Sequence, residues 1–286
     1  MRGGTRGGTT GVVRVGVNRT MLALTGVCTA AVLIPLFLIL FYVVREGAAG
    51  LNAAFFTRLP APPGVSGGGM ANAVVGTLEL LGMALALGIP LGLAGGIYVS
   101  EFAADRFSGA VRFAADALNG IPTIVTGLFV YALVVVPMHT FSGLAGAIAL
   151  AIIMLPVVLR ASDEVLRTVP HSYREAAVAL GATRWRVLRD VILRAAKSGL
   201  ISAGLLGLAR VAGETAPLLL TSLNSSQWTT RPGQPMASLT VQVFDYAISP
   251  YDDWHRQAWA GALTLIALIV VVSLIARLWG GIGKRA

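Results

Sequence analysis

The sequence predicts an all-helical membrane protein with six transmembrane helices, and three observations support this fold class. First, 56% of the 286 residues are hydrophobic, 12% are charged and the mean hydropathy is +0.77, which is more apolar than ordinary water-soluble domains. Second, six apolar runs are long enough to cross about 30 Å of hydrocarbon, which takes roughly 20 residues. Third, the basic residues are divided unequally between the two sides that these runs define.

The six expected spans occupy residues 21–44, 77–99, 119–138, 141–159, 198–220 and 259–276. With the amino terminus inside, the basic residues of both tails, of residues 100–118 and of residues 160–197 all lie inside. Those that lie outside are Arg45, Arg58, Arg231 and Arg256. This positive-inside pattern predicts a multi-pass protein of the plasma (cytoplasmic) membrane with both termini cytoplasmic. The net charge of +9 therefore follows from topology, and nucleic acid is not an expected partner.

The chain is expected to consist of one membrane domain and two tails. A cytoplasmic tail is expected at residues 1–20, the transmembrane domain at 21–276 and a second cytoplasmic tail at 277–286. A cleaved signal peptide is the alternative for the first apolar run. That run of about 24 residues exceeds a typical signal-peptide core, so an uncleaved span is favoured.

External loops are expected at about residues 45–71 and 221–255. The first is rich in proline and glycine, which is typical of an irregular, turn-rich connection. The second contains residues 236–247, a stretch whose composition allows a short interfacial helix. Its aromatic neighbours would anchor that helix among lipid headgroups or meet an outside partner, and the sequence leaves both roles open.

The long internal segment, residues 160–197, has the pattern of two short helices joined at a glycine. Ser172 and Glu175 have capping-box spacing, which predicts a helix that runs through Leu180 and ends at Gly181. Thr183 is in position to cap a second helix. The apolar residues that would share one face of that helix are Val187, Leu188, Val191 and Ile192.

Small residues recur at four-residue spacing in two of the spans. They are Gly88, Gly92 and Gly96 in the second span, and Gly199, Ala203 and Gly207 in the fifth. Because small residues let helices approach closely, these positions predict helix packing rather than chemistry. Pro90 and Pro122 are expected to kink or interrupt their spans.

Three ionisable residues fall inside expected spans. Arg210 and Glu214 are four residues apart in the fifth span, so on a continuous helix they share a face. Burying a charge in a bilayer is costly, so such residues usually face a bundle interior or an aqueous path. A transport pathway and a purely structural ion pair are the alternatives. Glu79 in the second span would pair with Arg210, be protonated or line the path, and the sequence does not decide among these roles.

The internal segment resembles the EAA loop of binding-protein-dependent ABC importers. The matching residues are Glu175, Ala176, Ala177, Gly181 and Leu193, and one departure is Arg194, where the family usually has proline. The resemblance implies cytoplasmic coupling helices that dock into a separate ATP-hydrolysing subunit. The alternative is a helix pair that lies on lipid headgroups, which does not require this spacing.

Three further stretches resemble the A-type permease subunit of the high-affinity inorganic-phosphate ABC importer. They are residues 209–219 (ARVAGETAPLL), 120–125 (GIPTIV) and 237–244 (ASLTVQVF) with Ser249, Pro250 and Tyr251, and the likeness runs from about residue 63 to 278. It implies the type I importer permease fold and pairing with a C-type permease subunit. It also implies two copies of a cytoplasmic ATPase and an external phosphate-binding protein, besides membrane lipid.

The resemblance implies a permease that catalyses no covalent step and binds no cofactor. ATP and Mg would be bound by the partner ATPase, because residues 281–285 lack the distal glycine and the Ser or Thr of a P-loop. His139, His171 and His255 fall in three different connections, so neither a metal cluster nor a catalytic triad is expected.

The expected substrate pathway contains Arg210, Glu214, Thr215, Glu79 and Thr123. A guanidinium matches the oxygens of an oxyanion with paired donors, and Glu214 can accept a hydrogen bond from a protonated phosphate oxygen, which sulfate lacks near neutral pH. The same architecture carrying molybdate or sulfate is the closer alternative. A membrane-embedded enzyme that uses Glu79, Arg210 and Glu214 as its polar site is the more distant one.

Overall fold

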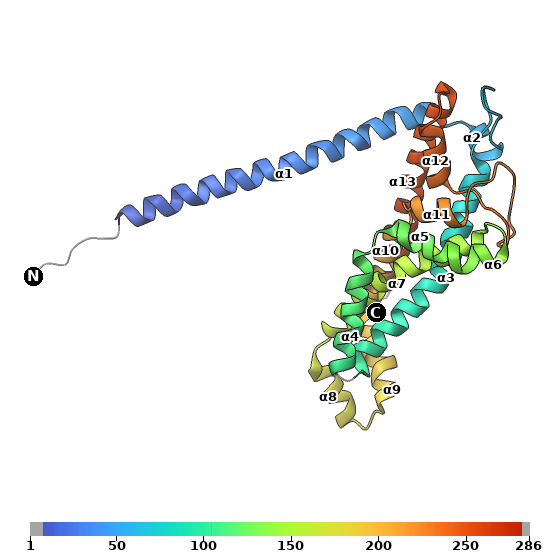
Figure 1. Ribbon diagram of the computed structural model, residues 1–286. Coiled ribbons are helices and arrows are strands. Elements are labelled where there is room, and N and C mark those ends of the chain that lie inside the picture. The colour runs from blue at the N-terminus through green and yellow to red at the C-terminus, as the bar shows by residue number, and fades with distance from the viewer. Residues whose placement is uncertain (1–7, 104, 282–286) are drawn as a thin grey trace, which may run out of the picture.

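The computed structural model describes residues 8–103 and 105–281, and within these ranges the chain folds into helices joined by loops (Figure 1). Five stretches are long and apolar enough to cross a membrane, and a bent pair makes a sixth candidate. The five are Arg14–Gly50, Ala71–Glu101, Gly143–Arg167, Arg184–Val211 and Asp252–Leu278. The predicted all-helical, multi-span class is therefore confirmed.

The third expected span, residues 119–138, is wrong at its start, because the chain turns sharply at Pro122. Helix α4 (Asp105–Gly120) ends before the proline, and α5 (Thr123–Val130) begins after it, with 98° between the two halves of the bent pair. The bend follows from Pro122, which has no N–H and adopts an extended ψ of 130°. The span continues from α5 through a π-helix, η1 (Tyr131–Val135), and α6 (Val136–Met138).

The fifth expected span, residues 198–220, is also broken. It enters through a three-residue helix, α9 (Arg184–Arg186), and a π-helix, η2 (Val187–Ile192), and continues as α10 (Leu193–Val211). A short helix, α11 (Ala216–Thr221), follows the break. Gly213 and Pro217 lie in or beside the break, where both residues disfavour a continuous helix. By contrast, α3 (Ala71–Glu101) runs through Pro90 without interruption.

Helix α7 (Gly143–Arg167) forms the centre of the bundle, with α3 and α10 packed against it. A Cβ atom added at Gly92 would lie 2.7 Å from Val158 Cβ, and one at Gly96 would lie 2.7 Å from Ser162 Cβ. On the α10 side, a Cβ at Gly207 would collide with Val158 and Met154. Both small-residue ladders therefore serve close helix packing, as predicted.

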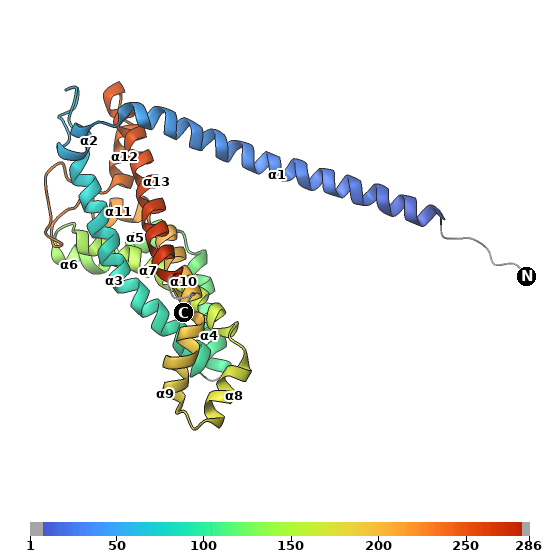
Figure 2. The ribbon, with the colours of Figure 1, turned by 180° about the vertical axis from the view of Figure 1, so that it is seen from behind.

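Helix α1 (Gly8–Gly50) extends away from the rest of the bundle and contacts it only near its carboxyl end, where it meets α13 (Asp252–Gly281) (Figures 1 and 2). There, Gly50 lies against the Arg256 carbonyl and Ala260. The helix begins at Gly8, inside the segment that was expected to be a tail. Residues 1–7 and 282–286 lie outside the described chain. Most apolar side chains of α1 are exposed, so apart from its contact with α13 this span lacks a packing partner within the described chain.

The two ends of the bundle carry different short elements (Figure 1). One end holds α8 (His171–Ala179) and α9, whereas the other holds α2 (Ala53–Thr57) and α12 (Leu239–Ala247). Helix α12 confirms the short helix expected within residues 236–247. Its first amide, on Leu239, donates to the Thr77 hydroxyl at 2.7 Å, which ties this loop to the start of α3.

Candidate functional site

The capping box predicted at Ser172 is wrong, although the first helix of the internal segment exists. Helix α8 starts two residues earlier than a cap at Ser172 requires, at His171, with Pro170 in the N-cap position and no capping hydrogen bond from a side chain. The proline, with φ −57° and ψ 140°, directs the chain into the helix before Ser172 is reached. Glu175 is therefore not used for capping, and its side chain is exposed without a described hydrogen bond or ion pair.

Gly181 ends this helix as predicted, through a Schellman motif. The Ala182 amide donates to the Ala177 carbonyl at 3.0 Å, and the Gly181 amide donates to the Val178 carbonyl at 2.9 Å. Gly181 has φ +79°, a left-handed conformation that glycine adopts without steric cost. The corner between the two predicted coupling helices is therefore built into the backbone.

The second half of the segment buries the predicted apolar face. Val187, Leu188 and Ile192 are buried in a cluster with Leu166 and Val169, and Leu193 packs against its edge. Thr183 occupies the N-cap position, but its side chain makes no capping bond. The corner itself is exposed and apolar at several positions, with 90% of Leu180 accessible. The other large exposed side chains there are Tyr173, Val178 and Trp185.

Arg174 fixes α8 to the bundle, a role that the sequence did not reveal. Its guanidinium donates to the Glu101 carboxylate at the end of α3, at 2.6 Å from Nη2 and 3.3 Å from Nε. Nη1 also donates to the Val169 carbonyl at 2.7 Å. Arg174 lies directly before Glu175, Ala176 and Ala177, so this clamp links the predicted coupling helix to a spanning helix. Glu101 and Arg174 are 73 residues apart, and no local pattern predicts their contact.

Helix α4 is held at the same end by a second ion pair that the sequence did not reveal. Asp163 on α7 is 1% exposed, and it accepts from Arg112 Nε at 2.6 Å and Nη2 at 2.9 Å. Arg160 bonds Asp116 on α4 at 2.8 Å. Ser108 and Ala115 are buried and Arg112 is partly buried, and their helical spacing is the sequence signal for α4.

Arg210 and Glu214 meet at the break after α10, not on one helix as predicted. Arg210 lies in the last turn of α10, which ends at Val211. Glu214 lies in the turn that follows, and its backbone amide donates to the Val211 carbonyl at 3.1 Å. Arg210 Nη1 donates to Glu214 Oε1 across this turn. The Arg210 side chain is 42% exposed and the Glu214 side chain 11%. Gly207 is buried against α7, so Arg210 does not share its packing face.

The other predicted pathway residues are not joined to this pair by hydrogen bonds in the described chain. Thr215 follows Glu214 and occupies the N-cap position of α11 without a capping bond from its side chain. Thr123 begins α5, whose Gly127 lies against Pro217 of α11. Glu79 lies half-buried on α3, and no ion pair with Arg210 is found among the described residues. The structure thus brings together Arg210, Glu214 and Thr215.

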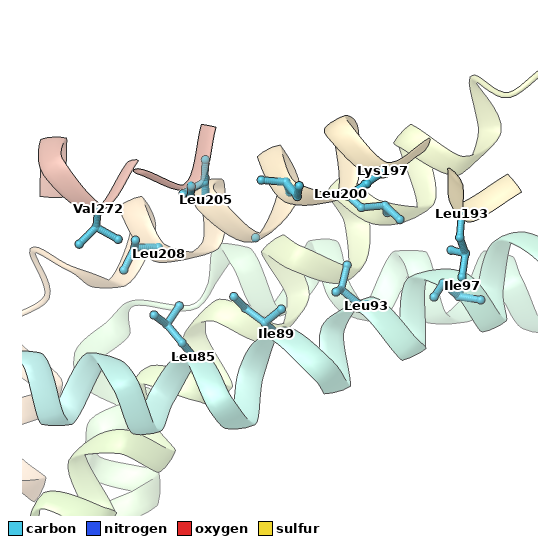
Figure 3. A pocket seen from close by; sticks show the side chains of 13 residues that line it. Leu85, Ile89, Leu93, Ile97, Leu193, Lys197, Leu200, Leu205, Leu208 and Val272 are labelled. Atoms are coloured by element: carbon cyan, nitrogen blue, oxygen red, sulfur yellow. The ribbon is translucent and has the colours of Figure 1, made fainter. Parts of the chain in front are cut away.

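A cavity of a different character lies between α3, α10 and α13 (Figure 3). It measures about 510 Å³ and is lined by apolar side chains such as Leu85, Ile89 and Leu208, with Lys197 as its one charged residue. Arg210 and Glu214 are not among the lining residues. Nor do the described residues contain a group of three or more His, Cys, Asp or Glu side chains placed to bind a metal ion.

Comparison with known families assigns the chain. Residues 88–281 match the family described as the binding-protein-dependent transport system inner membrane component. The chain belongs to this family. It is therefore a multi-pass permease subunit of a transport system that has further subunits, and not an enzyme.

Several relatives match almost the whole chain. The phosphate transport system permease protein PstA of Yersinia pestis is 43% identical over 261 residues, covering 91% of this chain and 88% of the relative. The Haemophilus influenzae PstA is 39% identical over 263 residues, covering 92% and 93%. A probable PstA of Methanocaldococcus jannaschii is 35% identical over 261 residues, covering 91% and 92%.

Solved importer structures share the fold at lower identity. An inward-facing form of the MetNI methionine ABC transporter aligns with a TM-score of 0.57 and 18% identity, covering 76% of this chain and 94% of that chain. A second form aligns with a TM-score of 0.55 and 20% identity, covering 74% and 94%. These likenesses show the type I importer permease fold that the sequence predicted.

Proposed function

We propose that this permease forms half of the translocation pathway of an ATP-driven inorganic-phosphate importer. The observation that carries the proposal is the likeness to PstA proteins along nearly the whole chain, at 35–43% identity in bacterial and archaeal relatives. By analogy with those systems, a C-type permease subunit would form the other half. Two copies of a cytoplasmic ATPase would hold ATP and Mg, and an external phosphate-binding protein would deliver the anion.

Arg210 is the proposed anion-binding residue, and its geometry suits that role. One of its five N–H donors is used by Glu214, and the others have no described partner. Because the side chain is 42% exposed at a helix break, the remaining donors can reach a ligand. A break also frees backbone polar groups, which are tolerated in a membrane only where they face protein or a water-filled cavity. Thr215, Thr123 and Glu79 are proposed to line the path.

The test must separate anion binding from a structural ion pair. Arg210→Gln alone strands a carboxylate, so the informative variant is Arg210→Gln with Glu214→Gln, which leaves neither residue unpaired. In the reconstituted transporter, we expect the double variant to assemble normally but to lose phosphate uptake and phosphate-stimulated ATPase activity. Its donors and positive charge are missing from the site. Uptake near the wild-type rate would show that Arg210 only packs the bundle.

Selectivity for phosphate over sulfate or molybdate is assigned to Glu214. The single variant Glu214→Gln replaces a carboxylate, which only accepts hydrogen bonds, with an amide that can also donate to an unprotonated oxygen, so the site no longer favours a protonated one. We expect it to narrow the difference between phosphate-stimulated and sulfate-stimulated ATPase activity. Equal stimulation of the wild-type complex by molybdate and phosphate would instead favour the alternative oxyanion importer.

The proposed orientation places the coupling segment in the cytoplasm, with both termini on that side. The positive-inside pattern supports this, as does the location of α8 and α12 at opposite ends of the bundle (Figure 1). Reporter fusions at Gly67, Glu175 and Ser225 should lie outside, inside and outside. An external reporter at Glu175 would contradict the ATPase docking proposal.

A further inference from the structure

A pocket of about 430 Å³ lies between the proline-rich loop and α12, far from the coupling segment. Residues 60–63 form one wall of it. The opposite wall contains Gln242, Asp245 and Tyr246, which share one face of α12 because they are three and four residues apart. Trp254 of α13 completes this wall and stacks on Tyr246, with ring centroids 4.3 Å apart and planes 13° from parallel.

Three buried polar atoms at this pocket lack hydrogen-bond partners in the described chain. They are Gln242 Oε1, the Tyr246 hydroxyl and Trp254 Nε1. The Gln242 amide lies beside the Tyr246 phenol, but not in hydrogen-bond geometry. Gln242 is 4% exposed and Tyr246 2%, so leaving these atoms unpaired costs about 1–3 kcal/mol for each group. The residues that carry these atoms line the cavity, so a ligand seated there lies close to groups that still need a hydrogen-bond partner.

The charge of the pocket indicates the chemistry of that ligand. Asp245 lines the wall and accepts a hydrogen bond from Asn224 at 2.7 Å, but it forms no ion pair among the described residues. None of the lining residues is basic. The carboxylate and two buried oxygens therefore offer acceptors to a cation, beside the faces of stacked aromatic rings that also attract cations. The same carboxylate disfavours an anion such as phosphate.

The walls of the pocket are fixed before any partner binds. Besides the Leu239 amide bonded to Thr77, the Ser222 hydroxyl donates to the Met236 carbonyl at 2.6 Å. The proline-rich loop is closed by the Gly69 amide, which donates to the Leu59 carbonyl at 3.0 Å. A preformed acceptor pocket avoids the entropic cost of ordering on binding, and such pockets take the anchor side chains of protein partners.

We propose that this pocket receives a lysine or arginine side chain of the external binding protein and anchors that protein to the permease. The proposal rests on the proposed function, in which an external binding protein meets the permease at the end that holds α12. The cationic head would meet Asp245, Gln242 and the Tyr246 oxygen. A backbone carbonyl of the same segment would accept from the indole N–H of Trp254.

The test measures the affinity of the assembled transporter, reconstituted in lipid discs, for its binding protein. Asp245→Asn keeps the shape of the pocket and removes its charge. We expect it to raise the dissociation constant about tenfold or more. Tyr246→Phe removes one unpaired hydroxyl and should raise the dissociation constant by a smaller factor. Asp252→Asn is the matched control, because it removes one exposed negative charge near the pocket but outside it, and affinity should stay within about twofold of wild type.

Two results would overturn the proposal. One is wild-type affinity in both Asp245→Asn and Tyr246→Phe, with melting temperatures that show intact complexes. The other is failure of every Lys→Glu or Arg→Glu substitution on the binding protein to rescue binding by Asp245→Lys. Either result leaves the phosphate-importer proposal standing as long as the wild-type complex transports phosphate. A wild-type complex that binds its partner but moves no phosphate would contradict the function and not the pocket.

Discussion

Two ion pairs of this chain, Arg112–Asp163 and Arg210–Glu214, differ in burial and in how fully their hydrogen bonds are satisfied. Asp163 is 1% exposed and accepts two hydrogen bonds from Arg112, with Arg160 and Arg167 nitrogens at 3.5 and 3.8 Å. Arg210 is 42% exposed and, among the described residues, makes a single hydrogen bond, to Glu214, across a helix break. The Arg112–Asp163 pair holds two helices together, whereas most N–H donors of Arg210 have no partner in the described chain.

The difference shows how one chain can use charge in two ways. At the end of the bundle that holds α8, the Asp163 network joins α4 to α7, and the Arg174–Glu101 clamp joins α8 to α3. At the break, the backbone of α10 has already ended, and the guanidinium is not needed to hold two helices together. The pairs at the α8 end therefore hold the short helices in place and would serve the proposed coupling, whereas Arg210 keeps donors available for the proposed ligand.

The largest loss of stability is expected on substitution of Asp163. If that loss were absent, the contrast between the two ion pairs would be wrong. Asp163→Ala leaves Arg112 and part of Arg160 without their buried partner, which should cost about 3–5 kcal/mol. The thermal unfolding midpoint of the purified permease complex would report this loss. Glu164→Ala is the matched control, because Glu164 is 69% exposed and meets Arg160 at 3.6 Å, so its loss should change stability by less than about 1 kcal/mol. Equal midpoints for the two variants would mean that burial does not distinguish these acids.

A smaller effect on stability, but a clear one on coupling, is expected at Arg174. Arg174→Met keeps the length of the side chain but removes the bonds to Glu101 and to the Val169 carbonyl, at a cost of about 1–3 kcal/mol. ATP hydrolysis should continue while transport per ATP falls, because α8 is no longer fixed to the end of α3. Arg189→Met is the control on an arginine that is 66% exposed. Normal transport per ATP in Arg174→Met would limit the clamp to a packing role.

Much of the bundle could be predicted from the sequence because its causes are local. Hydropathy located the spans, and small residues at four-residue spacing located the faces that pack on α7. Gly181 marked the corner for the same reason, since a glycine at the end of a short amphipathic run predicts a left-handed residue. The Arg210–Glu214 pair also followed from four-residue spacing, but its setting did not, because hydropathy averages over the break near Gly213.

The remaining features depend on contacts that the sequence does not display. Arg174 and Glu101 are 73 residues apart, and Arg112 and Asp163 are 51 residues apart. In both pairs, the sequence shows only ordinary charges near the ends of spans. Helix α4 was overlooked because its polar composition resembles a loop. Ser172 was assigned as a cap because its spacing to Glu175 fits, although Pro170 starts the helix earlier.

The smallest effect on stability is expected at Gly181. Its corner depends on backbone conformation, whereas the proposed role of Arg210 depends on its side chain. A Cβ atom there would have no neighbour within 4 Å among the described residues, so the cost of Gly181→Leu comes mainly from φ +79° and should be about 1–2 kcal/mol, confined to the corner. Gly181→Asn is the informative partner, because asparagine tolerates that conformation but still adds a side chain.

Substrate-stimulated ATPase activity and uptake separate the two causes. If only the conformation matters, Gly181→Leu uncouples the complex and Gly181→Asn does not. If the ATPase cleft closes tightly over the corner, both variants uncouple it, because the added atoms meet the partner rather than this chain. Normal coupling in Gly181→Leu would show that the corner does not dock closely, and the exposed Leu180 beside it would then be the residue to test as the contact.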